Sequence, residues 1–238
     1  PSWRLVRRYH PGTVLLVGAA MGIGLALPAT FLRTYAAELS IPRIGLFFGV
    51  YAPTAILTRI LTRRLPERFG LRPMILVGLG TLTVGQVLLI FVSSEWTFIA
   101  PGIVYGAGHA ILVPATLAAG SRAFPDRYRG LGTTLIMATF DVGNLVGAPA
   151  AGAIVHVSGK VGLPGYPTMF LSMAVMLALA GLVYGLTTRH SARPPKARPP
   201  RRTPLARPVK TPTLVDVGAD NGPRHEAGAP TDTGASAG

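Results

Sequence analysis

Apolar residues along this chain fall into six runs, each close to 20 residues long, separated by short polar segments. The runs cover approximately residues 11–32, 44–61, 74–92, 97–119, 131–157 and 168–187. An α-helix of about 20 apolar residues is long enough to cross roughly 30 Å of hydrocarbon. The pattern therefore predicts an all-α, polytopic membrane protein with six transmembrane helices.

Composition and charge agree with that class of protein. The mean hydropathy is +0.44, and charged residues make up 13% of the chain, which is too few for an ordinary soluble domain. A net charge of +14 could indicate nucleic-acid binding, but the charges cluster between the apolar runs and at the end of the chain, so no nucleic-acid partner is expected. There are no cysteines, and no metal or other cofactor is predicted.

The distribution of Lys and Arg predicts the orientation of the spans. Alternate segments carry very different numbers: 19 basic residues lie before the first run, in residues 62–73, between the fourth and fifth runs and after the sixth, against 3 in the other loops. By the positive-inside rule the first set is cytoplasmic. Both termini are then cytoplasmic, as an even number of spans requires. The bilayer, most simply the plasma membrane, is the expected environment.

Three regions follow from these patterns. Residues 1–10 form a basic cytoplasmic segment, residues 11–189 a six-helix transmembrane bundle, and residues 190–238 a Pro- and Arg-rich cytoplasmic tail. The tail is predicted to be disordered because it cannot bury an apolar face. It could bind an SH3-like domain, but loose contact with anionic lipid headgroups is favoured. Because the chain begins at Pro1 without Met, we interpret it as part of a longer parent.

Small residues recur at four-residue spacing inside the runs. In lipid such spacing lets helix backbones approach and pack closely. The longest stretch of this kind lies in the fifth run and includes Gly143, Gly147 and Gly152. The pattern predicts a tightly packed bundle.

The fifth run carries an acidic residue near its middle. If that helix begins near Gly130, Asp141 lies about 16 Å into the membrane, with Asn144 on the same face. Ionisable groups at this depth are candidates for substrate or proton pathways. The alternative is a structural polar contact with another part of the protein.

His109 lies at a similar depth in the fourth run, about 18 Å from its start. It could relay protons with Asp141, but a hydrogen bond to a neighbouring backbone carbonyl is the favoured interpretation. Gln86 and Tyr51 are further candidates that could line a cavity. Arg59 lies near the end of its run and is expected to reach toward the cytoplasmic surface.

The turn at residues 62–73 resembles a known sequence motif. It contains R-R-L-P-E-R-F-G-L-R, which is similar to the signature loop G-x-L-A-D-R-x-G-R-R of the major facilitator superfamily. The matching positions are Leu65, Glu67, Arg68, Gly70 and Arg72. The departures are Arg63 in place of the first Gly, Glu in place of Asp, and Leu71 in place of a basic residue.

The resemblance extends over the six runs. Residues 105–152 contain G-x-G-H-x-x-x-x-P, P-D-R-x-R-G and F-D-x-G-x-x-x-G-x-x-x-x-G, and look like spans ten and eleven of the drug- and sugar-efflux-like branches. Residues 3–189 look like the C-terminal six-helix half of such a carrier. The resemblance implies the fold of half a twelve-helix transporter, whose partners are the missing N-terminal half or a second copy and a small-molecule substrate.

The resemblance also implies a function. We expect alternating-access transport, specifically proton-coupled efflux of a small molecule, with Glu67, Arg68, Gly70 and Arg72 acting as a conformational latch. A loop that only fixes the topology is the alternative role for these four residues. A six-helix membrane scaffold or binding module without transport is the alternative function. No protease, zinc or phosphate-loop motif is present, so an enzyme is not predicted.

Overall fold

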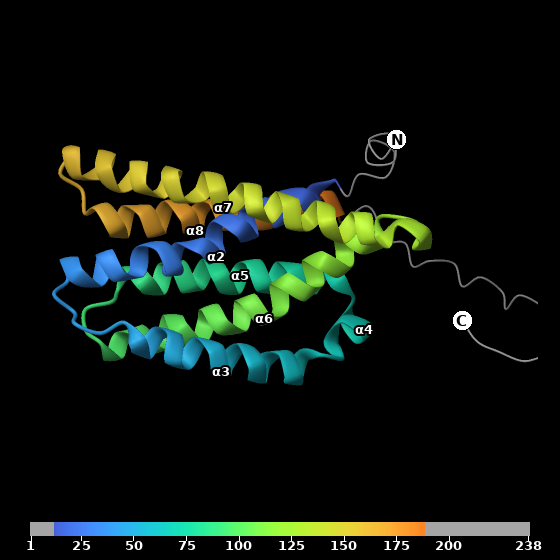
Figure 1. The fold of residues 1–238 in the computed structure, drawn as a ribbon, viewed down its shortest axis with the longest axis horizontal. Helices are drawn as coiled ribbons and strands as arrows, with labels where there is room; N and C mark the ends of the chain where they lie inside the picture. Colours follow the sequence, from blue (N-terminus) through green and yellow to red (C-terminus); the bar gives the residue numbers. More distant parts are fainter. Residues whose placement is uncertain (1–11, 189–238) are drawn as a thin grey trace, which may run out of the picture. The chain divides into compact units, whose positions relative to one another are not determined.

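The structure, a computed structural model, describes residues 12–188 (Figure 1). Within that range it contains six helices long and apolar enough to cross a membrane. This confirms the prediction of an all-α membrane protein with six spanning helices. They are α2 (Thr13–Glu38), α3 (Gly45–Thr62), α5 (Leu71–Ile90), α6 (Ile99–Arg122), α7 (Arg129–Lys160) and α8 (Gly165–Thr188). The short helix α4 (Leu65–Phe69) and the 3₁₀ turns η1 (Trp96–Phe98) and η2 (Asp126–Tyr128) lie in the connections.

The predicted basic segment 1–10 and the predicted disordered tail 190–238 lie outside the described residues.

Helix α2 runs six residues past the end of the first apolar run. It closes at Ser40, which has a positive φ of 55°. The amide of Ser40 donates to Ala37 O at 3.1 Å, and that of Ile41 to Ala36 O at 2.8 Å, which together form a Schellman motif. Because serine is an unusual residue at this position, the sequence gives no clear signal for this helix end.

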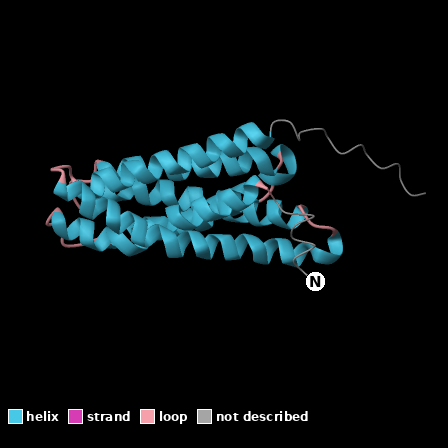
Figure 2. Cartoon of the chain, turned by 90° about the horizontal axis from the view of Figure 1, so that it is seen from above, coloured by secondary structure: helices cyan, strands magenta, loops and turns pink. Residues whose placement is uncertain are grey.

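The six long helices lie side by side and are joined by short loops at the two ends of the bundle (Figures 1 and 2). Helix α2 packs against α7, α8 and α6, and α5 packs between α6 and α8. Helix α3 is held mainly by α6 and has a single buried residue, Phe47. The bundle therefore combines a well-packed centre with one peripheral helix.

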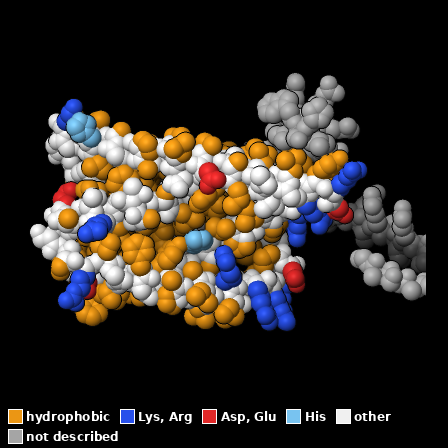
Figure 3. Space-filling model, in the orientation of Figure 1, with side chains coloured by type: hydrophobic (Ala, Val, Ile, Leu, Met, Phe, Trp, Pro, Cys, Tyr) orange, Lys and Arg blue, Asp and Glu red, His pale blue; other side chains and the backbone are white. Residues whose placement is uncertain are grey.

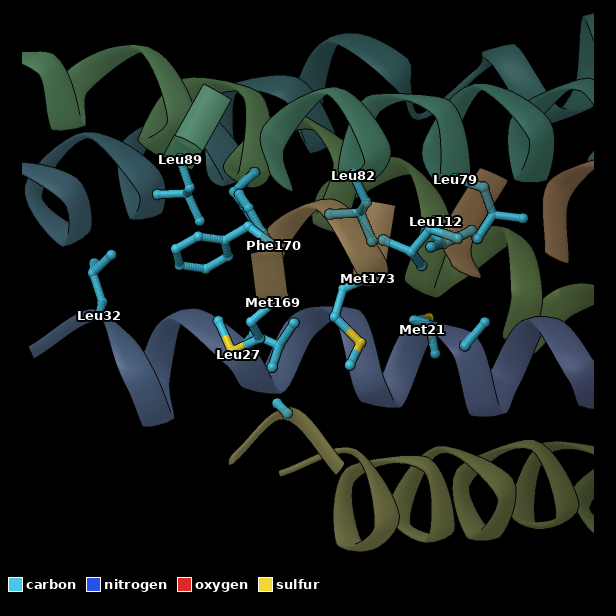
Figure 4. Close-up of a cluster of buried hydrophobic side chains, with 14 of the residues drawn as sticks. Met21, Leu27, Leu32, Leu79, Leu82, Leu89, Leu112, Met169, Phe170 and Met173 are labelled. Carbon is cyan, nitrogen blue, oxygen red and sulfur yellow. The ribbon is translucent and has the colours of Figure 1, made fainter. Parts of the chain in front are cut away.

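The buried apolar core lies where α2, α5, α6 and α8 meet (Figure 4). Leu27 of α2, Leu82 of α5, Leu112 of α6 and Phe170 of α8 are each completely buried. In a bilayer, burying such side chains gains little from the exclusion of water, so dense van der Waals contact holds this centre together.

The first and last described helices begin and end next to each other. The hydroxyl of Thr187 donates to that of Thr13 at 3.2 Å, so the start of α2 and the end of α8 adjoin. Arg72, at the start of α5, reaches the same end, where its Nη2 donates to Gly185 O at 2.8 Å. The basic turn at residues 62–73, the start of α2 and the end of α8 therefore lie at the same end of the bundle. An even number of spans requires this arrangement.

Candidate functional site

Two of the predicted site residues contact each other across neighbouring helices. Tyr51 lies midway along α3 and His109 midway along α6. The tyrosine hydroxyl is hydrogen-bonded to Nδ1 of the imidazole, and the ring centroids lie 5.8 Å apart. The favoured expectation of a backbone carbonyl partner for His109 is therefore wrong, because the partner is a side-chain hydroxyl.

Glycines in α6 bring these two side chains together. A Cβ at Gly106 would overlap the carbonyl oxygen of Tyr51 and lie 3.1 Å from Thr54 Cβ. One turn earlier, a Cβ at Gly102 would lie 2.7 Å from the carbonyl oxygen of Phe47. Only residues without a side chain permit this approach, so α3 lies against the backbone of α6 and the Tyr51 ring reaches His109.

The Tyr51–His109 pair borders an open cavity of about 260 Å³ between α3 and α6. Arg59 also lines this cavity, two helical turns along α3 from Tyr51. The complete lining is Tyr51, Ala52, Ala55, Ile56, Arg59, His109 and Ala110. A second cavity of about 490 Å³ shares Arg59 and Ala110 with the first.

The sequence interpretation missed Arg59 as a member of this site. It took the side chain to extend toward the membrane surface. The spacing of Tyr51, Ala55 and Arg59, four residues apart on one helix face, was the available signal.

Gln86, a candidate for lining a cavity, lies in the closed interior instead. Its side chain on α5 is completely buried, and its Nε2 donates to Gly24 O of α2 at 3.5 Å. The buried Tyr105 hydroxyl donates to the same carbonyl at 3.4 Å. Pro28 explains this arrangement, because it lacks the N–H that would otherwise bond the carbonyl four residues earlier. We call Gly24, Gln86 and Tyr105 the closed cluster.

Asp141 and Asn144 lie on an exposed face of α7 and are not brought to His109. No hydrogen bond or ion pair joins Asp141 to His109 among residues 12–188. Helix α7 begins at Arg129, which places Asp141 about 18 Å from that end. Figure 3 shows acidic and histidine side chains between the ends of the bundle, surrounded by apolar groups. A carboxylate at this depth is costly against lipid, so this face requires water or protein beside it.

The glycines of α7 lie on a different face, against α2. A Cβ at Gly143 would overlap the carbonyl oxygen of Ala19, and one at Gly147 would lie 3.0 Å from Ile23 Cα. Gly152 is different, since the nearest atom to its added Cβ is Phe31 Cζ at 3.9 Å. The close approach of α2 and α7 therefore centres on Gly143 and Gly147 and has ended by Gly152.

The predicted latch residues lie in and around α4. Gly70 ends α4 and precedes α5 with a φ of 82°, a conformation that favours glycine. Arg72 connects two helix ends: its Nε donates to Thr188 Oγ1 at 2.9 Å, in addition to its bond to Gly185 O. Glu67 and Arg68 form no ion pair in the described part of the chain, where Asp126 and Arg129 make the one ion pair found.

Residues 12–188 contain no group of three His, Asp or Glu side chains arranged to hold a metal ion. The polar groups of the candidate site residues on the spanning helices include hydrogen-bond donors, the carboxylate of Asp141 and the guanidinium of Arg59.

Comparison with known proteins assigns the family. A sequence profile described as Major Facilitator Superfamily matches residues 12–219, which include all six spanning helices. The chain belongs to the Major Facilitator Superfamily. Its six helices and its signature-like loop are thus those of a family of transporters.

Individual superfamily relatives match shorter parts of the chain. An uncharacterized MFS-type transporter of Mycobacterium tuberculosis is 34% identical over 122 residues, 49% of this chain and 21% of its own length. Multidrug resistance protein 1 of Bacillus subtilis is 28% identical over 77% of this chain and 46% of its own length. A protein of Agrobacterium vitis named for tartrate transport is 28% identical over 58% of this chain and 32% of its own. The chain thus spans less than half the length of each of these relatives.

Proposed function

We propose that this chain forms the C-terminal six-helix half of a secondary transporter that exports a small molecule at the expense of the proton gradient. Transport would proceed by alternating access, with the substrate held between two halves near the membrane midplane. Membership of a transporter family supports the general activity. The direction, the coupling ion and the role of this half are our proposal.

The exposed polar face of α7 is the observation that carries this proposal. Asp141 is the one acidic residue of 12–188 that lies deep inside a spanning helix, because Glu38, Glu67, Glu95 and Asp126 lie at helix ends or in connections. A carboxylate exposed at this depth can bind a proton in one conformation and release it in the other. Asn144, one turn away, offers a neutral polar contact on the same face.

The same face supports the proposed partner. Val142, Leu145 and Val146 of α7 are more than half exposed beside Asp141. On such a surface, the apolar side chains can pack against another helical bundle. The carboxylate can line a polar pathway between the two bundles. We propose that this bundle is the N-terminal half of the transporter or a second copy of the chain. We further propose that the protein lies in the plasma membrane, with its basic turns in the cytoplasm.

Replacement of Asp141 tests the proton pathway. The complete protein, encoded by the reading frame that contains this chain, is reconstituted in liposomes that hold a pH-sensitive dye. Proton movement is recorded after addition of ethidium, tetracycline or tartrate. We expect Asp141→Asn to reduce substrate-driven proton movement to the level of protein-free liposomes, because the amide cannot exchange a proton.

The matched control is Asp126→Asn, which removes a carboxylate from the exposed connection η2. It should leave proton movement unchanged. Full coupling in the Asp141→Asn protein would refute Asp141 as the proton site.

A further inference from the structure

The cavity between α3 and α6 is lined by hydrogen-bond donors and a cation. We call Tyr51, His109 and Arg59 the open cluster. Tyr51 and His109 are half-buried, and Arg59 is exposed. Figure 3 shows histidine and basic side chains near each other on this face.

The charge of Arg59 has no counterion within the described chain. Residues 12–188 contain five acidic side chains, and none of them lines either of the two cavities that Arg59 borders. No ion pair to Arg59 is formed in that range either. A guanidinium on a membrane-spanning helix is stabilised by an anion or by water, so an anion that enters this cavity would meet an uncompensated positive charge.

The Tyr51–His109 hydrogen bond leaves one further donor in either tautomer. If the tyrosine hydroxyl donates to Nδ1, the imidazole proton is on Nε2 and can be donated elsewhere. If Nδ1–H donates to the tyrosine oxygen, the hydroxyl proton remains for another acceptor. In both cases the pair keeps a donor at a cavity that the Arg59 guanidinium also lines, whereas a cation in this cavity would be repelled by that guanidinium.

The remaining lining limits the size and character of the occupant. Ala52, Ala55, Ile56 and Ala110 are small or apolar and offer no side-chain hydrogen bonds. A volume of about 260 Å³ is below the range usual for drug-sized ligands. The cavity thus suits a compact apolar body that carries one anionic group.

We propose that Arg59, His109 and Tyr51 form a binding subsite for the carboxylate of a small organic acid. The guanidinium of Arg59 binds the carboxylate oxygens, and the Tyr51–His109 pair donates a further hydrogen bond. The identity of this anion as cargo rests on the transport function proposed above. The binding itself does not require transport.

Binding of 4-fluorobenzoate tests the subsite. The purified complete protein in detergent is titrated with this carboxylate and, separately, with 4-fluorobenzamide, its neutral counterpart, and binding is followed by the broadening of the fluorine NMR signal, which detects weak complexes. We expect the carboxylate to bind and the amide to bind at least tenfold more weakly, because charge-assisted hydrogen bonds contribute about 1.5–3 kcal/mol.

Three variants locate the bound anion. Arg59→Gln should weaken carboxylate binding by about tenfold or more, and Tyr51→Phe by a smaller factor, because it removes only a neutral donor. Arg43→Gln is the charge-matched control, since Arg43 is exposed just before α3, away from the cavity lining. It should bind like the unmodified protein. Thermal unfolding of each variant establishes that it is folded.

Each contrary result is decisive. Equal binding of carboxylate and amide, absence of carboxylate binding, or unchanged binding by Arg59→Gln would overturn the subsite. A protein that transports but does not bind the carboxylate retains the proposed function and loses this inference. A protein that binds the carboxylate but transports nothing retains this inference and loses the proposed function.

Discussion

The closed and open clusters both place polar side chains between spanning helices of one bundle, yet their surroundings differ. In the closed cluster, Gln86 and Tyr105 are fully buried and both donate to Gly24 O. In the open cluster, Tyr51 and His109 are hydrogen-bonded to each other, while Arg59 borders a cavity and has no ion-pair partner among residues 12–188. The comparison shows that a position between spanning helices does not by itself assign a role to a polar residue. What distinguishes the clusters is whether an unmet charge or donor faces open space.

The two clusters also arise from different backbone features. The closed cluster exists because Pro28 removes a helical hydrogen bond and leaves a carbonyl for side chains of neighbouring helices. The open cluster exists because Gly102 and Gly106 let α3 approach α6. The first feature adds an acceptor that must be satisfied, and the second brings together side chains that can still bind something else.

Separating α3 from α6 should produce the largest effect. Gly106→Leu places atoms where the backbone of α3 now lies, so α3 must move away and Tyr51 must lose His109. We expect the free energy of unfolding, measured by SDS titration in mixed micelles, to fall by about 3 kcal/mol. Binding of 4-fluorobenzoate should be lost as well.

Gly49→Leu on α3 is the control for that substitution. An added Cβ at Gly49 meets no atom within 4 Å. Its free energy of unfolding should change by no more than about 0.5 kcal/mol. Equal destabilisation by the two leucines would show that close packing at Gly106 does not hold α3 in place.

A smaller effect should follow from removing both donors of the closed cluster. The double variant Gln86→Leu/Tyr105→Phe leaves Gly24 O unpaired in an apolar interior. We expect the free energy of unfolding to fall by about 1–2 kcal/mol. In a Pro28→Ala background the same two substitutions should change the free energy of unfolding little, because the restored N–H of residue 28 can donate to Gly24 O. The set of variants forms a mutant cycle, and an undiminished loss in that background would contradict the role given to Pro28.

Substitutions in the open cluster should have the smallest effect on stability. Tyr51→Phe and Arg59→Gln each remove a group that is half-buried or exposed, and neither leaves a cavity in the core. The free energy of unfolding should change by no more than about 0.5 kcal/mol, while carboxylate binding weakens. Destabilisation as large as that of the closed-cluster variants would show that the open cluster is structural.

The sequence predicted the fold well because the bilayer imposes a length and a composition on each span. The number and order of the helices follow from the apolar runs. Because the described range contains only five acidic residues, few charges interrupt these runs and their limits are easy to recognise. The end of α2 was less predictable, because the residue with positive φ is Ser40 rather than glycine. Its Schellman motif depends on the path of the following loop.

The candidate sites were predicted only in part. Tyr51 and His109 were both identified, but their hydrogen bond joins side chains that lie 58 residues apart in the chain, and periodicity cannot reveal such a pairing. The burial of Gln86 was not predicted, because its partner, the Gly24 carbonyl that Pro28 leaves without a helical N–H, lies on another helix. Arg59 was set aside because a basic residue near a helix end commonly extends to the surface. Asp141 keeps its predicted role as a proposal.

The attachment of α3 mainly to α6 gives the open cluster a mechanical property. Two of its three side chains, Tyr51 and Arg59, belong to α3, and the third, His109, belongs to α6. A sliding or tilting of α3 as a rigid rod would separate the tyrosine from the imidazole and withdraw the guanidinium in the same movement. Assembly and dismantling of this cluster are therefore linked to the position of one helix, whose buried Phe47 ring also contacts Tyr105 of the closed cluster.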